Sequence, residues 1–83
     1  MTQRVTFTER ARRDCRKVGL TEDDAREAID NPEKERQHRD GDDVFIDSVR
    51  GLSKNELLVV TSLQQSDGRL VYRVFRIHRD ELK

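Results

Sequence analysis

The last apolar stretch of the chain carries side chains that could act on a phosphodiester. In RLVYRVFRIH, residues 69–78, polar and apolar residues alternate, and Tyr72, Arg76 and His78 share one parity. Because side chains alternate across a strand, these three are predicted on one open face of a sheet. Histidine can move a proton near neutral pH, arginine can stabilise phosphate charge, and tyrosine can stack on a base. The same pattern also fits an ordinary strand whose polar end reaches water.

The other parity of this stretch places Arg73 among Val71, Phe75 and Ile77. This mainly apolar set is predicted to lie beneath the helices. Arg73 then needs a partner, because an uncompensated buried charge costs on the order of several kcal/mol. A catalytic site would use His78 as acid or base, Arg76 and Arg73 as phosphate contacts, and Tyr72 as the stacking residue.

Further basic residues could bind a nucleic acid outside this strand. In ERQHRD, Arg36 and His38 share a face, with Lys34 beside them; they either line a groove at a sheet edge or only keep that edge from aggregating. Arg10 and Arg13 are the candidate phosphate contacts of a basic helix, whose cations could equally serve to keep it solvated. The basic residues of that helix are Arg10, Arg12, Arg13, Arg16 and Lys17.

Metal and cofactor chemistry have little support in the sequence. The two histidines, His38 and His78, and the single cysteine match no metal-ligand spacing. There is no glycine-rich phosphate loop and no serine-based triad pattern, so no metal and no cofactor is predicted. Cys15 falls on the apolar stripe of the basic helix, where a small buried side chain is expected rather than a nucleophile.

The elements that position these residues follow from periodicity and capping. Thr8 and Thr21 are predicted N-caps, Gly19 ends the first helix, and Asn31-Pro32 ends the second. The dipeptides Asp40-Gly41 and Asp67-Gly68 predict hairpin turns. The expected elements are a strand over 4–8, helices after Thr8 and Thr21, and strands over 33–39, 44–49, 56–63 and 69–78. The predicted fold is therefore α+β: a short N-terminal strand, two helices, then a three- to four-stranded antiparallel sheet covered by the helices on one side.

Composition limits the size of the core and the classes of partner. The 83 residues are 41% charged and 33% hydrophobic, which predicts a single domain over 1–83 with a small core and leaves room for a homodimer. The formal net charge is zero, but residues 1–20 hold six basic and two acidic side chains, whereas residues 21–50 hold five and eleven. This polarity could orient a polyanion or an acidic protein, or reflect solvated faces. No apolar run suits a signal peptide or a membrane span, so a cytoplasmic protein without a membrane partner is predicted.

The segment FTERARRDCRKVGLTEDDAREAIDNP, residues 7–32, resembles the N-terminal part of small bacterial domains related to the BrnT and RelE-like toxins. Those domains pass from a short strand through a helix, a Gly-[Ile/Leu]-[Ser/Thr] step and a second helix ending near Asn-Pro. Here the step is Gly19-Leu20-Thr21. The resemblance implies a RelE-like fold and a metal-independent endoribonuclease of a toxin-antitoxin system, neutralised by an antitoxin protein. The histidine that members often carry early in the first helix is replaced by Arg10, which can hold phosphate but cannot shuttle protons.

Two functional hypotheses follow. In the first, the chain is a RelE/BrnT-like toxin-type domain that binds, and with His78 also cleaves, RNA, with RNA or the ribosome and an antitoxin as partners. In the second, it is a non-catalytic protein-interaction module, such as an inactive relative, a phage regulator or an immunity-type protein.

Overall fold

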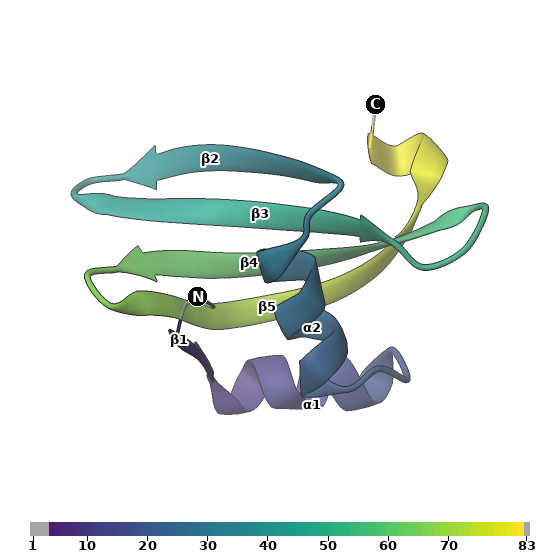
Figure 1. The fold of residues 1–83 in the computed structure, drawn as a ribbon, viewed down its shortest axis with the longest axis horizontal. Coiled ribbons are helices and arrows are strands. Elements are labelled where there is room, and N and C mark those ends of the chain that lie inside the picture. Colours follow the sequence, from purple (N-terminus) through teal and green to yellow (C-terminus); the bar gives the residue numbers. More distant parts are fainter. Residues whose placement is uncertain (1–3, 83) are drawn as a thin grey trace.

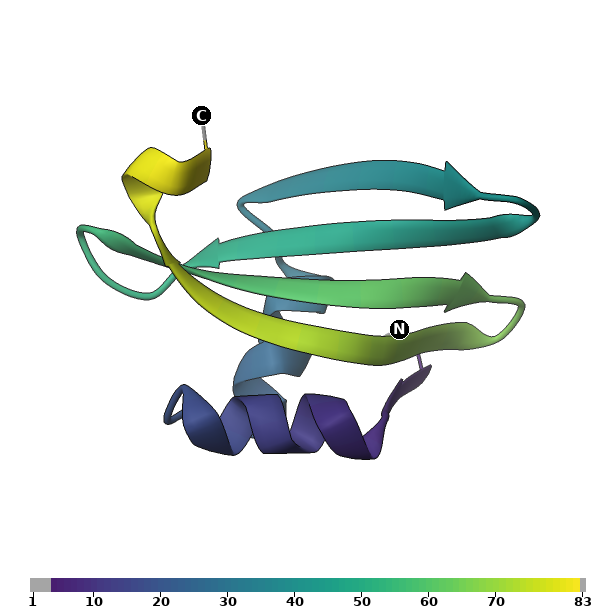
Figure 2. The same ribbon diagram turned by 180° about the vertical axis from the view of Figure 1, so that it is seen from behind.

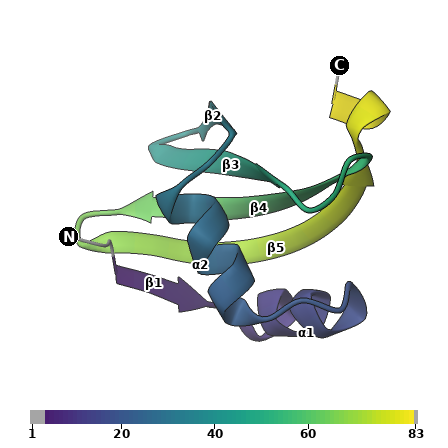
Figure 3. The same cartoon turned by 45° about the vertical axis from the view of Figure 1, so that its right-hand side comes forward.

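Two helices pack against one face of a five-stranded sheet in the computed structural model, which describes residues 4–82 (Figures 1 and 2). The predicted order of strands and helices is confirmed, and a short 3₁₀ helix follows the last strand. The elements are β1 (Arg4–Phe7), α1 (Glu9–Lys17), α2 (Glu22–Asp30), β2 (Lys34–Asp40), β3 (Asp43–Gly51), β4 (Glu56–Gln65), β5 (Gly68–His78) and η1 (Arg79–Leu82). In Figure 3, α2 crosses the sheet obliquely while α1 lies beside β5.

The sheet is mixed, with strand order β1-β5-β4-β3-β2. Strands β2 to β5 are antiparallel neighbours, as predicted, but β1 joins the sheet as a fifth strand, parallel to β5. The prediction of a three- to four-stranded antiparallel sheet is therefore incomplete. Gly68 permits the close approach of β1, since a Cβ there would lie 1.9 Å from the backbone oxygen of Arg4.

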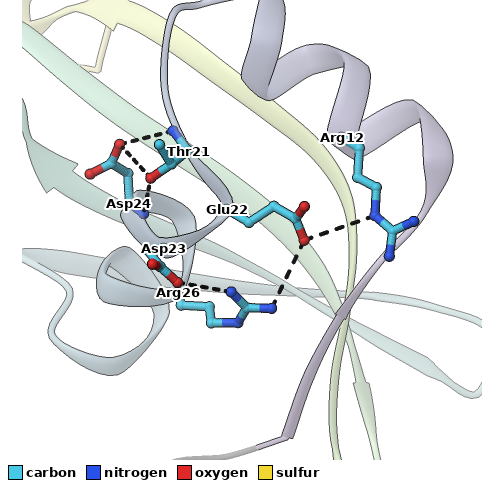
Figure 4. Close-up of polar contacts among 6 residues, drawn as sticks. All are labelled: Arg12, Thr21, Glu22, Asp23, Asp24 and Arg26. Carbon is cyan, nitrogen blue, oxygen red and sulfur yellow. Dashed lines mark hydrogen bonds and ion pairs between the residues drawn. The ribbon is translucent and has the colours of Figure 1, made fainter.

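Both helices begin at the predicted caps. The Thr8 hydroxyl accepts a hydrogen bond from the Ala11 amide, and Thr21 forms a reciprocal capping box with Asp24 (Figure 4). Gly19 has φ 73°, a conformation that favours glycine and turns the chain directly after α1.

The core lies between the helices and the sheet. Small residues on the helices, Ala11 and Cys15 of α1 and Ala25 and Ala28 of α2, let the helix backbones approach the sheet closely. The buried residues of this cluster are Phe7, Ala11, Cys15, Ala25, Ala28, Ile29, Leu58, Val60, Val71 and Val74.

A β-bulge in β5 reverses which residues face the helices. Thr61 pairs with Arg73 but Ser62 pairs with Val71, so Tyr72 is an extra residue without an opposite partner. Consequently Val71 and Val74, of opposite parity, both lie in the helix-covered core.

The predicted faces of β5 are therefore wrong beyond Tyr72. Val74 was expected on the open face but is buried beneath the helices, and Arg76 shares its side of the strand. Phe75 and Ile77 were expected beneath the helices but line a depression on the opposite face. The alternating pattern of the sequence cannot reveal an extra residue, because the bulge is defined by the pairing with β4.

Candidate nucleic-acid interface

A basic groove lies between α1 and the edge of β5 that β1 leaves free. It encloses about 810 Å³. Pairing with β1 ends at Val71, so α1 rather than another strand lies along the remainder of β5. The groove is lined by Arg10, Arg13, Asp14, Arg16, Lys17 and Arg73.

Asp14 anchors α1 to the free edge of β5. Its Oδ2 accepts hydrogen bonds from Nε of Arg73 at 2.8 Å and from the Val74 amide at 3.1 Å. The carboxylate thus satisfies a backbone donor that has no strand partner and supplies the counter-charge that Arg73 was expected to need. The Arg73 guanidinium also lies 4.7 Å from the centroid of the Phe75 ring.

The Asp14 carboxyl is held in its ionised form. Burial alone would raise its pKa, but the hydrogen bonds from Arg73 and Val74, with the positive charges of Arg73 and Arg10, lower the pKa below its ordinary value. The groove therefore contains one carboxylate among five cationic side chains.

Four of those cations are uncompensated. Arg10, Arg13, Arg16 and Lys17 form no side-chain hydrogen bond or ion pair within residues 4–82, and all four are exposed. Arg12, on the other flank of α1, lies outside the groove and its Nε is 3.8 Å from Glu22 (Figure 4). The positive charge available to an anion is consequently concentrated on the flank of α1 that faces Arg73.

The groove joins three of the predicted site residues, Arg10, Arg13 and Arg73. Sequence reasoning did not assign a role to Asp14, although it lies four residues after Arg10 and therefore on the same side of the helix. Its partner Arg73 lies 59 positions away, so the pair itself had no local signal.

Arg76 is held away from this groove by three hydrogen bonds. Nε and Nη2 each lie 2.9 Å from a carboxylate oxygen of Glu56, and Nη1 donates to the backbone oxygen of Val18 at 3.1 Å. The hydrogen bond and charge of Arg76 lower the pKa of Glu56. These contacts connect β5, β4 and the end of α1, so Arg76 acts as a structural clamp.

His78 and Tyr72 do not join Arg76 in a common site. Nδ1 of His78 accepts a hydrogen bond from the Asp80 amide at 3.2 Å, and the His78 amide donates to Glu81 at 2.7 Å, so His78 belongs to the start of η1. The Tyr72 ring lies 6.1 Å from Phe45, on the face away from the helices. The predicted convergence of Tyr72, Arg76 and His78 on one open face is therefore not observed.

The remaining predicted contacts lie on the open face of the edge strand β2. Arg36 and Lys34 border a depression of about 150 Å³ with Asp47 and the apolar side chains of Val49, Val59, Phe75 and Ile77. His38 stacks on Phe45 with ring centroids 5.6 Å apart. Of the residues expected either to line a groove or to protect the sheet edge, Arg36 and Lys34 line this depression and His38 does not. The depression is mainly apolar and separate from the basic groove.

Arg69 is a buried cation that sequence reasoning did not single out. Its side chain is 7% exposed, and its Nη atoms lie 3.5 Å from Ser48 and from Glu35. It connects β5 with β3 and β2 on the helix-covered side, which indicates a structural role.

Two classes of site find no support in the part of the chain that the structure describes. Among residues 4–82, no group of three or more His, Cys, Asp or Glu side chains could hold a metal ion. Both α-helices in this range are too short and too polar to cross a membrane.

Comparison with known proteins gives no relative. Searches against protein-family models, curated proteins and solved structures return no significant match.

Proposed function

We propose that this protein binds single-stranded RNA through the basic groove between α1 and β5, as a RelE/BrnT-like domain of toxin type. The observation that carries the proposal is the set of four exposed, uncompensated cations on one flank of α1, beside Arg73. Phosphate contacts from lysine and arginine supply most of the affinity of such complexes and require no base-specific geometry.

The groove suits a flexible backbone better than a small anion. Its volume of about 810 Å³ exceeds that needed for one phosphate, and its cations are spread from Arg10 to Lys17 along two turns of α1. Successive phosphates of a single strand could each meet one cation while Asp14 keeps Arg73 in place.

Cleavage is not part of this proposal. Tyr72 and Arg76 lie on different faces of the sheet, Arg76 is engaged with Glu56, and His78 is bound to the first turn of η1. The general acid and the phosphate contacts that a metal-independent ribonuclease needs within hydrogen-bond reach of one substrate are therefore apart.

A matched pair of variants tests the binding site. Replacing Arg10 and Arg13 with glutamine removes two groove cations, whereas Arg12→Gln removes a cation from the other flank of the same helix. At about 0.7 kcal/mol for each exposed phosphate contact, the double variant should bind a short RNA about tenfold more weakly. Arg12→Gln should bind as the parent does. Equal losses from both, measured by fluorescence anisotropy on folded protein, would show that only general positive charge matters.

The salt dependence gives an independent measure. Single strands contribute a slope of about −0.7 per phosphate contact in a plot of log affinity against log salt, so five cations predict a slope of about −3.5. Loss of Arg10 and Arg13 should reduce it to about −2. A flat salt dependence in the parent protein would contradict phosphate binding.

A non-catalytic protein-interaction module is the second candidate, favoured by the open sheet face. Phe45, Val59, Phe75 and Ile77 are only partly buried there, since both helices lie on the other face. Expression in bacteria separates the candidates: growth arrest that Arg10→Gln with Arg13→Gln relieves favours the RNA-binding toxin type, and harmless expression favours the interaction module.

A further inference from the structure

Strand β2 is a complete and uncovered sheet edge. It pairs with β3 on one side only, and all seven of its residues are exposed. Figures 1 and 3 show neither helix over it, and η1 lies beyond the end where the strand begins. In an antiparallel pair, alternate residues direct their backbone N–H and C=O groups away from the neighbour. The outer side of β2 therefore offers a row of backbone groups to another strand.

Backbone geometry restricts how a second copy of β2 could pair with this edge. In an antiparallel arrangement about a two-fold axis, a residue whose backbone groups point outward must face another such residue. Because these residues alternate along β2, the numbers of two opposite residues are both even or both odd. The two-fold axis therefore passes through a residue position rather than between two positions. The central residues of KERQHRD, Arg36, Gln37 and His38, are the three possible centres.

The charges of β2 select one of these three registers. With the axis at Gln37, Lys34 faces Asp40 of the second copy and Glu35 faces Arg39; symmetry repeats each pair. An axis at Arg36 would place Arg36 opposite itself, which is repulsive. An axis at His38 places Arg36 opposite Asp40, which symmetry repeats, and forms no other opposite-charge pair. The register about Gln37 thus has four opposite-charge pairs, against two about His38 and none about Arg36.

We propose that two copies of this chain associate through antiparallel pairing of β2 with β2, centred on Gln37, to form one continuous sheet. Lys34, Arg39 and Asp40 form no side-chain hydrogen bond or ion pair among residues 4–82, so they are free to make these contacts. The fourth residue, Glu35, already lies 3.5 Å from Arg69 and would share its carboxylate between Arg69 and Arg39 of the second copy. A charged edge can also serve only to prevent pairing, but such an edge has no need of a self-complementary order of charges.

The proposed dimer leaves the basic groove open. Residues that face one another across paired strands lie on the same face, so the helices of both copies would cover the same side of the joined sheet. The groove lies at β5, across β4 and β3 from the dimer edge. Dimerisation is therefore independent of the RNA-binding proposal, and either can fail without the other.

Charge reversal with restoration tests the register. Lys34→Asp places two like-charge pairs at the interface and should weaken the dimer about tenfold, while Lys34→Asp combined with Asp40→Lys restores opposite charges. Sedimentation velocity at protein concentrations up to about 1 mM measures the association. The dimer should be present in the parent, weakened in the single variant and recovered in the double variant. A parent that stays monomeric, or a double variant no better than the single one, would overturn the proposal.

Cross-linking provides a readout that does not depend on charge. Gln37→Cys would bring two cysteines opposite each other at a Cβ separation of about 5 Å, close to what a disulfide needs. Lys34→Cys is the control, because six residues separate it from its opposite position and the two thiols would lie about 20 Å apart. Cys15 is 3% exposed and is present in both variants. Oxidation should give a covalent dimer with Gln37→Cys only; equal yields from both variants would contradict the register.

Discussion

Among substitutions that remove one small polar side chain, Asp14→Ala should reduce the stability of the fold most. The carboxylate accepts two hydrogen bonds, from Arg73 at 2.8 Å and from Val74 at 3.1 Å, and its side chain is 13% exposed. Hydrogen bonds to a charged group contribute about 1.5 to 3 kcal/mol each, but Arg73 is 35% exposed and would be partly rehydrated. We therefore expect a loss of about 2 to 3 kcal/mol in the free energy of unfolding, or about 10 to 20 °C in Tm.

Asp23→Ala is the matched control for burial. Its Oδ1 lies 3.0 Å from Nη1 of Arg26, a similar distance, but its side chain is 91% exposed (Figure 4). An exposed ion pair in the first turn of a helix should contribute less than about 1 kcal/mol. Urea unfolding at pH 7 compares the two variants with the parent protein.

The pH dependence of the same variants checks the cause. The pKa of Asp14 is lowered in the folded state, so its contribution is complete above the unfolded pKa, near 4, and is lost as pH falls through the folded pKa. The stability difference between the parent and Asp14→Ala should therefore shrink as pH falls below about 4. A loss under about 0.5 kcal/mol at pH 7, or a difference that does not change in acid, would refute this account of the Asp14 contacts.

Three further predictions concern other parts of the fold. Gly68→Ala should lower the free energy of unfolding by about 1 to 3 kcal/mol in urea titrations, because the new Cβ would collide with the backbone of Arg4; wild-type stability would contradict the close β1 to β5 pairing. Arg76→Ala should lower Tm in calorimetry but leave RNA affinity unchanged within about twofold, since Arg76 binds Glu56 and Val18 and does not line the groove. A large loss of RNA affinity at unchanged Tm would instead show that Arg76 contacts the RNA. Cys15 should react with a thiol reagent only as fast as the protein unfolds, because burial raises its thiol pKa and excludes solvent; rapid labelling of native protein would disprove this burial.

Local signals were sufficient to predict the elements. The caps at Thr8 and Thr21, the turn at Gly19 and the polar edge character of β2 depend on residues within a few positions of one another. Each was therefore readable from the sequence, and each is confirmed.

Features that depend on strand pairing were not predictable in the same way. The parallel contact of β1 with β5 joins residues about 64 positions apart, and the bulge at Tyr72 exists only relative to β4. That single extra residue places Arg76 on the helix side and separates it from Tyr72, so the predicted catalytic arrangement was lost. Arg73 could be predicted to need a counter-charge, but not that Asp14 of α1 would supply it.

The most direct test of the basic groove is an NMR titration of the ¹⁵N-labelled protein with a short single-stranded RNA. The proposal predicts that the Nε–Hε signal of Arg73 and the amide signals of residues 10–17 shift together, while those of the open face around Lys34 and Arg36 do not. Shifts confined to the open face would contradict the claim that RNA binds in the basic groove. The absence of any shift, with an RNA whose binding is detected by fluorescence anisotropy, would contradict it as well.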